Sequence, residues 1–251
     1  MLNYYSRQSN SGNFTKVDKP PRGGNVWIHV DEANKADADK LIKAYNLDAD
    51  IIKDVFDPNE LPHIEYSEDG RTLYVFLRKA WRSKTDQIKT LPLLVVVGDK
   101  DFITISQAHS NLPLNNIDIK TYSLQQSQYF LLLSLIYTIV SEYGGLVNHT
   151  SEVVHTMKYR LRSHEITNKD FYRFITIEDN IAIYKYNLRA IISLIERLRD
   201  NQDIASNHDM IEAIDDILLY VRQLLASVES SEHSVASLYN VYSTVANNTL
   251  N

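Results

Sequence analysis

The sequence contains no cysteine in its 251 residues. This absence excludes disulfide bonds, thiol catalysis and thiolate metal sites, and it suits a reducing compartment. The chain also has no excess of basic residues: it contains 26 Lys and Arg and 32 Asp and Glu, for a net charge of −6. A chain with this charge balance is not expected to bind nucleic acid.

Targeting and membrane-spanning segments are also missing. Residues 1–5 lack the basic start and the apolar core of a signal peptide. The most apolar run, residues 129–140, is shorter than the roughly twenty residues that a bilayer span needs. We predict that this run belongs to a buried helix and that the chain is soluble.

Glycine and proline are confined to the first part of the chain, and none of the seven Gly or six Pro follows Gly145. Long stretches without either residue are typical of long helices. We predict helices over residues 124–162 and 169–199, with a softening of the first at Gly144 and Gly145. The short polar break between the two helices predicts an antiparallel pair.

The N-terminal half shows a different pattern. Short runs rich in β-branched and aromatic residues, bounded by turn residues, predict strands at 13–17, 26–30, 63–66, 72–81, 91–97 and 102–106. Helical periodicity predicts helices at 36–45 and 49–56. The predicted fold class is α/β followed by a helical extension: a mixed β-sheet layered with helices, an antiparallel helix pair and one very long C-terminal stalk helix. The predicted domains are residues 1–122, 123–205 and 206–251.

The final helix, predicted from about residue 207 to 251 and capped by Ser206, carries apolar or small residues in an unbroken 4,3,4,3 alternation. They are Met210, Ile214, Ile217, Val221, Leu224, Val228, Ser231, Val235, Leu238, Tyr242 and Val245. This alternation is the seam of helices that pack lengthwise on partners. A helix of this length, roughly 65 Å, exceeds what the chain needs to cover its own core. We therefore predict an oligomeric stalk, and the alternative is an ordinary amphipathic helix.

Residues 247–251 carry none of the usual stop signals, so we expect the helix to continue in a longer protein.

Four short segments occur in an order that resembles one protein family. They are residues 27–30 (WIHV), 51–57 (IIKDVFD), 61–66 (LPHIEY) and 73–77 (LYVFL). With the helix pair and the long final helix, they resemble the cytosolic domain of CorA-type magnesium transporters over essentially the whole chain. The family's Gly-Met-Asn signature and both membrane helices are absent from this sequence. Leu61 stands in place of the usual arginine and His63 in place of the usual lysine.

The resemblance implies a homopentamer in which stalk helices surround a pore, and in which divalent ions between neighbouring cytosolic domains hold that pore closed. The best-matched carboxylates are Asp54 and Asp216, with Asp215 as a substitute. Mg²⁺ suits them because it is held through one or two carboxylates and keeps several waters. The alternative is that these aspartates are solvated surface charges. The resemblance places Asn251 and Asn240 near the pore.

Catalytic motifs are missing from the sequence. It has no G-x-S-x-G elbow, no P-loop and no G-x-G-x-x-G motif. His149, Glu152 and His155 lack the i, i+4 histidine spacing of a helical zinc pair. We therefore predict that the protein is not an enzyme.

The predicted function is the cytosolic regulatory domain of a CorA-like channel for Mg²⁺ or Co²⁺, gated by metal binding between subunits. The full-length protein is expected in the cell membrane, through C-terminal helices that this sequence lacks, with this part in the cytoplasm. Two alternatives stay open. One is the zinc-transporting branch of the same family, for which Zn²⁺ is the ion, and the other is a soluble scaffold that oligomerises through its heptad helix.

Overall fold

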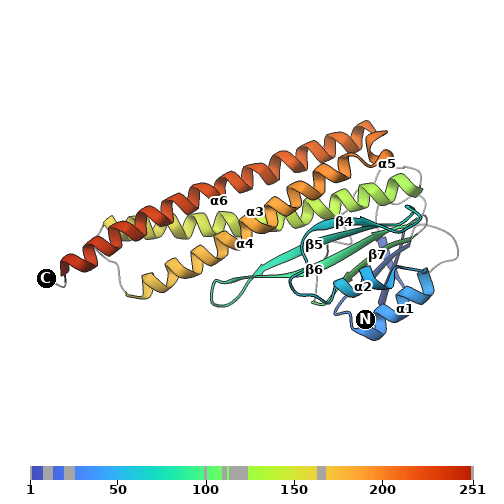
Figure 1. The fold of residues 1–251 in the computed structure, drawn as a ribbon, viewed down its shortest axis with the longest axis horizontal. Helices are drawn as coiled ribbons and strands as arrows, with labels where there is room; N and C mark the ends of the chain where they lie inside the picture. Colours follow the sequence, from blue (N-terminus) through green and yellow to red (C-terminus); the bar gives the residue numbers. More distant parts are fainter. Residues whose placement is uncertain are drawn as a thin grey trace.

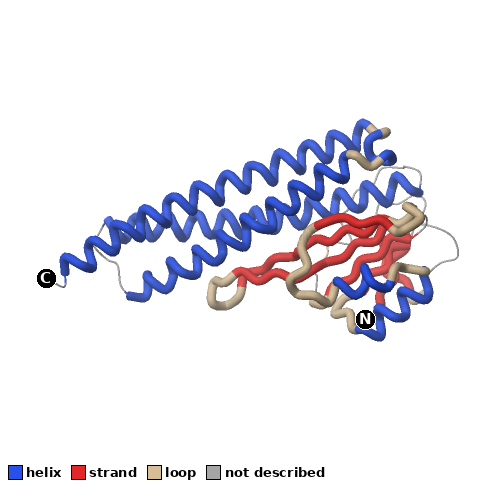
Figure 2. Tube along the Cα trace, viewed as in Figure 1, coloured by secondary structure: helices blue, strands red, loops and turns tan. Residues whose placement is uncertain are grey.

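The computed structural model describes residues 2–7, 14–19, 26–98, 101–108, 112, 124–162 and 168–249. A seven-stranded sheet carries two short helices on one face and three long helices on the other (Figures 1 and 2). The long helices extend well beyond the sheet, and the C-terminal end of the chain lies at the end of the bundle that is far from the two short helices (Figure 1). The predicted fold class, a mixed sheet layered with helices and followed by long helices, is confirmed.

The sheet joins two groups of strands through one parallel pair. In spatial order it runs β2-β1-β3-β7-β6-β5-β4. The strands are β1 (Leu2–Arg7), β2 (Phe14–Val17), β3 (Val26–Val30), β4 (His63–Tyr66), β5 (Leu73–Arg82), β6 (Ile88–Val97) and β7 (Asp101–Ser106). Among the strands that the structure describes, only β3 and β7 are parallel neighbours, and every other pair is antiparallel. All six predicted strands are present, whereas β1 was not predicted.

β6 begins three residues before the predicted start and includes Pro92. A proline has no backbone N–H, so it cannot donate a hydrogen bond to a neighbouring strand and is rarely found where a strand is paired on both sides. Pro92 is opposite Arg78 of β5, while the pairing of β6 with β7 begins only at Leu93. The proline is therefore tolerated because it lies where β6 has a neighbour on one side only.

Alternate residues of the central strands face two separate cores, as the two-residue period of a strand requires. One core joins β-strand residues such as Ile28, Phe76 and Val96 to α1 (Lys35–Tyr45) and α2 (Ala49–Asp54). The other joins Trp27, Val75, Leu77 and their neighbours to the long helices. The indole N–H of Trp27, fully buried, donates to the Thr104 hydroxyl at 2.9 Å. The central strands are thus covered on both faces.

The remaining helices are α3 (Leu124–Arg162), α4 (Asn168–Arg199), α5 (Gln202–Ala205) and α6 (His208–Thr249). α3 and α4 run antiparallel, as predicted (Figure 1). Within α3, the segment Gln128–Leu161 contains an 18-residue window with a mean hydropathy of 1.7, and it is the one described helix long and apolar enough to cross a bilayer. In the structure 56% of its apolar window is buried. The prediction of a buried helix around residues 129–140 is confirmed.

The apolar seam of α6 is buried inside the chain. Nine of its residues are at most 7% exposed: Met210, Ile214, Ile217, Val221, Leu224, Val228, Ser231, Val235 and Leu238. They pack against α3 and α4, which lie along α6 on either side. The prediction that this seam holds an oligomeric stalk together is therefore wrong, because two helices of the same chain cover it.

The start of α6 also differs from the prediction. The side-chain oxygen of Asn207, not that of Ser206, accepts the Met210 N–H at 3.2 Å. The Ser206 hydroxyl donates instead to the Asp203 carbonyl in the short helix α5. The segment between α4 and α6 thus contains one extra helical turn, α5, and the cap of α6 lies one residue later than predicted.

The two adjacent glycines of α3 are expected to respond in opposite ways to alanine. The helix is continuous through both, so the predicted softening is not observed. A Cβ at Gly145 meets nothing within 4 Å, whereas one at Gly144 collides with the Tyr220 hydroxyl of α6. Gly145→Ala should raise the free energy of unfolding by about 0.5–1 kcal/mol, the usual gain in a helix interior. Gly144→Ala should show no such gain. Urea unfolding of the two variants measures the difference, and equal gains would contradict the close approach of α3 and α6.

Candidate functional site

Asp54, the first predicted metal ligand, is the last residue of α2. The Asp48 carboxylate caps this helix by accepting the N–H groups of Asp50 and Ile51. Ile51 and Ile52 are buried against the sheet, which leaves the Asp54 side chain exposed. Burial raises the pKa of the Asp54 carboxyl, and the nearby Glu65 carboxylate raises it further. Asp54 thus lies in a negative field that a bound cation would relieve.

The loop that follows Asp54 is held in place by a buried arginine of β5. The Arg78 guanidinium is 7% exposed and donates to the carbonyls of Pro58, at 2.8 Å, and Glu60, at 2.5 Å. It also donates to the Thr90 hydroxyl of β6 at 2.7 Å. Burial lowers the pKa of Arg78. Because backbone and hydroxyl oxygens satisfy its donors, Arg78 fixes the acidic loop to the sheet.

His63, at the start of β4, lies among the carboxylates near Asp54. Its Nε2 is 2.7 Å from Glu65 Oε1, and its Nδ1 is 2.8 Å from the Leu61 carbonyl. Its ring stacks on Phe76 at a centroid distance of 4.6 Å. Both ring nitrogens thus lie within hydrogen-bonding distance of oxygen atoms. His63 occupies the position where the resemblance expects a lysine.

Asp215 and Asp216 occupy different sides of α6, because neighbouring helical residues point about 100° apart. Asp215 is paired with Arg199 of α4, with an Nη1 to Oδ1 distance of 3.0 Å. Asp216 is exposed, and no ion pair to it is found among the described residues. Of the two, Asp216 is the carboxylate that is available to a cation.

Asp54 and Asp216 do not meet within one chain. α2 covers one face of the sheet, whereas α6 belongs to the bundle on the other face (Figure 1). Among the residues that the structure describes, no group of three or more His, Asp or Glu side chains is arranged to hold a metal ion. A site that uses both aspartates requires a second copy of the chain.

Asn240 and Asn251 were both predicted to lie near a pore. Asn240 is exposed in the last third of α6. Asn251 lies outside the described residues. After Glu232, α6 carries no Lys, Arg, Asp or Glu, so Asn240 stands in an uncharged stretch of the helix. The pore-lining role of the two asparagines stays a prediction.

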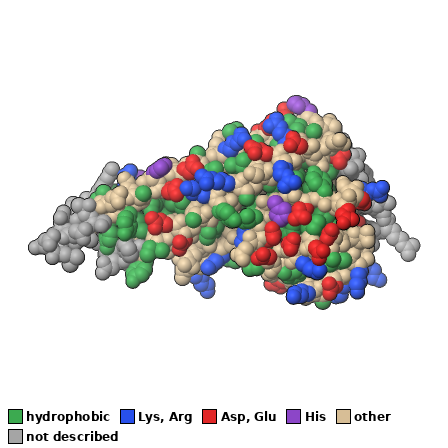
Figure 3. Space-filling view, viewed as in Figure 1, with side chains coloured by type: hydrophobic (Ala, Val, Ile, Leu, Met, Phe, Trp, Pro, Cys, Tyr) green, Lys and Arg blue, Asp and Glu red, His purple; other side chains and the backbone are tan. Residues whose placement is uncertain are grey.

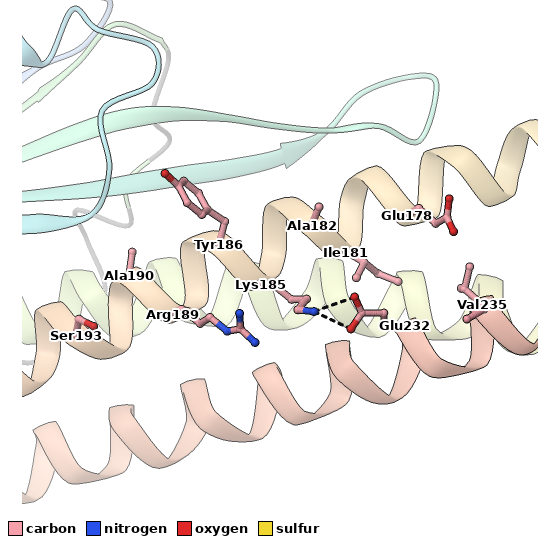
Figure 4. Close-up of a pocket in the computed structure, with 11 residues that line it drawn as sticks. Glu178, Ile181, Ala182, Lys185, Tyr186, Arg189, Ala190, Ser193, Glu232 and Val235 are labelled. Atoms are coloured by element: carbon pink, nitrogen blue, oxygen red, sulfur yellow. Dashed lines mark hydrogen bonds and ion pairs between the residues drawn. The ribbon is translucent and has the colours of Figure 1, made fainter.

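A polar feature that sequence analysis did not find is a row of ion pairs between α4 and α6. The pairs are Lys185–Glu232, Arg189–Glu229, Glu196–Arg222 and Arg199–Asp215. Figure 4 shows the first of them at the wall of a groove of about 700 Å³, where the Lys185 ammonium bridges both Glu232 carboxylate oxygens at 2.7 and 2.8 Å. Each cation of the groove has a carboxylate partner across the helix pair. The row therefore fixes the register of α4 against α6.

Solved structures share this architecture. The soluble domain of CorA from Methanocaldococcus jannaschii matches with a TM-score of 0.79 at 14% identity, over 96% of this chain and 95% of that one. The complete CorA magnesium transporter from the same organism matches with a TM-score of 0.82 at 13% identity, over 100% of this chain and 78% of that one. The cytoplasmic domain of ZntB from Vibrio parahaemolyticus gives 0.56 at 13% identity, over 95% and 97%. The fold is that of the CorA soluble domain.

A family model confirms the resemblance noted in the sequence. Residues 22–251 match the model described as CorA-like Mg2+ transporter protein. A comparison with curated proteins finds no match. The chain belongs to the CorA-like Mg²⁺ transporter family, and it corresponds to the cytosolic domain of a divalent cation transporter.

Proposed function

We propose that this chain is the ion-sensing cytosolic domain of a CorA-like channel for Mg²⁺ or Co²⁺, which assembles as a homopentamer in the cell membrane. Divalent ions bind between neighbouring copies and hold the pore closed, and no chemical step is involved. The observation that carries this proposal is the placement of Asp54 and Asp216. Both are exposed, and they lie on opposite layers of the domain, so an ion that they share joins two copies.

The chemistry of the two positions suits a hard, hydrated cation. Mg²⁺ dehydrates reluctantly and binds proteins through one or two carboxylates while it keeps several waters. Burial raises the pKa of the Asp54 carboxyl, and Glu65 and other nearby acids raise it further, so a divalent ion there relieves repulsion. Without the ion, carboxylates from two copies repel each other and the interface loosens. Ion occupancy thus biases one arrangement of the copies over another.

Mg²⁺ is expected to stabilise and to associate the chain, and both effects should depend on the two aspartates. A ligand that binds only the native state adds about 1.4 kcal/mol at ten times its dissociation constant. Thermal melts and sedimentation velocity over a Mg²⁺ titration should show a rise in melting temperature and in sedimentation coefficient. Asp54→Asn and Asp216→Asn should each lose both responses. Asp39→Asn, an exposed aspartate of α1, is the matched control and should keep them.

Repeating the titration with Co²⁺ and Zn²⁺ distinguishes the branches of the family, because a zinc-specific member would respond to Zn²⁺ at lower concentration than to Mg²⁺. An increase in sedimentation coefficient that survives in both variants would show that the copies associate without this site. The scaffold alternative relied on the heptad seam of α6, and the burial of that seam within the chain removes its basis.

A further inference from the structure

Charge is divided unevenly between the two ends of the molecule. Residues 31–71, which include α1, α2 and β4, hold twelve Asp and Glu against five Lys and Arg. Figure 3 shows acidic side chains crowded over the sheet half of the molecule. The tip of the β5–β6 hairpin and the adjoining ends of α3 and α4, residues 81–89, 149–162 and 168–177, hold eight Lys and Arg against three Asp and Glu. In a chain of net charge −6, this second set alone has net charge +5.

The basic set lies toward the C-terminal end of α6. The end of α3 and the start of α4 reach the same end of the bundle as the end of α6, far from α1 and α2, and the β5–β6 hairpin points in that direction (Figure 1). The stretch of α6 that follows Glu232 carries no charged Lys, Arg, Asp or Glu to offset it. The domain is therefore electrically polar along its long axis, with its positive end where α6 finishes.

The same end exposes large apolar and aromatic side chains. Tyr159 and Tyr172 are 69% and 71% exposed, and Ile175, Tyr239 and Val241 are also exposed. Tyr159 follows the exposed Lys158, and Tyr172 precedes the exposed Arg173. Tyrosine beside lysine and arginine is the composition of protein surfaces at the membrane–water boundary, where the ring enters the headgroup region and the cation meets lipid phosphate.

We propose that this end of the domain, formed by Lys84, Lys158, Tyr159, Tyr172 and Arg173, binds the surface of a bilayer that contains anionic lipid. This inference rests on the proposed function in one respect, namely that the end of α6 faces the membrane. Charge complementarity favours an anionic bilayer as the partner of this surface. Basic residues near a negatively charged leaflet are attracted to it, whereas the acidic end around α1 and α2 is repelled, so the field orients the domain. Two copies that meet basic end to basic end repel each other.

The test is cosedimentation of the 251-residue chain with vesicles, at low salt and with a chelator present so that no divalent ion takes part. Vesicles of phosphatidylcholine with about 30% phosphatidylglycerol should bind the chain, and pure phosphatidylcholine should bind it far more weakly, because the attraction depends on anionic lipid. The double variant Lys84→Gln with Lys158→Gln should bind about 25-fold more weakly, since each basic residue near the surface contributes about a factor of five. Lys40→Gln with Lys43→Gln, two exposed lysines of α1, should bind like the parent.

Tyrosine variants separate this proposal from a protein contact. Tyr159→Ser with Tyr172→Ser should weaken vesicle binding and leave the sedimentation coefficient without lipid unchanged. The proposal is overturned if the α1 lysine pair matters as much as the Lys84 and Lys158 pair, if pure phosphatidylcholine binds equally well, or if the tyrosine variants alter only self-association. Because a chelator is present throughout, these outcomes are independent of the Mg²⁺ response of Asp54 and Asp216.

Discussion

Val221→Asp is expected to prevent the chain from folding. Val221 is 0% exposed in the seam of α6, between α3 and α4. A carboxylate there would lose its hydration with no cation beside it, and burial of an unpaired charge costs more than a marginally stable domain can tolerate. Circular dichroism and urea unfolding of the purified chain should show loss of the cooperative transition, or a loss of at least about 4 kcal/mol where a transition remains.

Leu219→Asp is the matched control. Leu219 is two residues away on the same helix but 57% exposed. Substitutions at such surface positions usually change stability by no more than about 0.5 kcal/mol. The pair of variants tests which partner covers the seam. If the seam joined different chains, Val221→Asp would give a folded, dissociated chain, and that outcome would falsify the intrachain packing of α6.

Arg78→Met is expected to lower the free energy of unfolding by at least about 3 kcal/mol, because hydrogen bonds from a charged donor contribute about 1.5–3 kcal/mol each. The substitution keeps an apolar stem but leaves the carbonyls of Pro58 and Glu60 without their donor. Urea unfolding measures the loss. The control is Arg71→Met, whose guanidinium is 74% exposed and is 3.9 Å from an Asp69 carboxylate oxygen. An exposed pair of this kind contributes little, so the control should stay close to the parent.

The Arg78 variant should also disturb the proposed ion site. The loop that Arg78 holds connects α2, which ends at Asp54, to β4, which begins at His63. If the Mg²⁺-dependent rise in melting temperature persists undiminished in Arg78→Met, then the position of this loop is irrelevant to the sensor. A reduced response with an intact Asp39→Asn control would assign Arg78 a positioning role.

Most elements of the fold could be predicted from the sequence, because their patterns are local. Alternation and turn residues located six strands to within three residues, and the absence of glycine and proline located the long helices. β1 was missed because Leu2–Arg7 is short and mostly polar or aromatic, and it is ordered by pairing with β2 and β3. The cap at Asn207 was missed because Ser206 and Asn207 are equally good capping residues.

The candidate site was harder to predict, because partners distant in the sequence decide it. The heptad pattern of α6 is the same whether the seam meets helices of its own chain or of another, so periodicity alone could not choose between them. The pairing of Asp215 with Arg199, which leaves Asp216 as the available carboxylate, depends on the register of α4 against α6. Arg78 had no sequence signal at all: only the structure shows a buried arginine satisfied by backbone carbonyls.

The parallel pairing of β3 with β7 limits the order in which this chain can fold. β4 to β7 are joined by pairings between successive strands, so that meander can form through short loops. β3 can pair with β7 only after a long loop has closed, because 77 residues separate Trp27 from its hydrogen-bond partner Thr104. Closing a loop of that length lowers the conformational entropy of the chain before the new contact stabilises it, and this slows folding. On the ribosome, the N-terminal strands therefore remain without their central neighbour until β7 has been synthesised, and the sheet is completed late and as a unit.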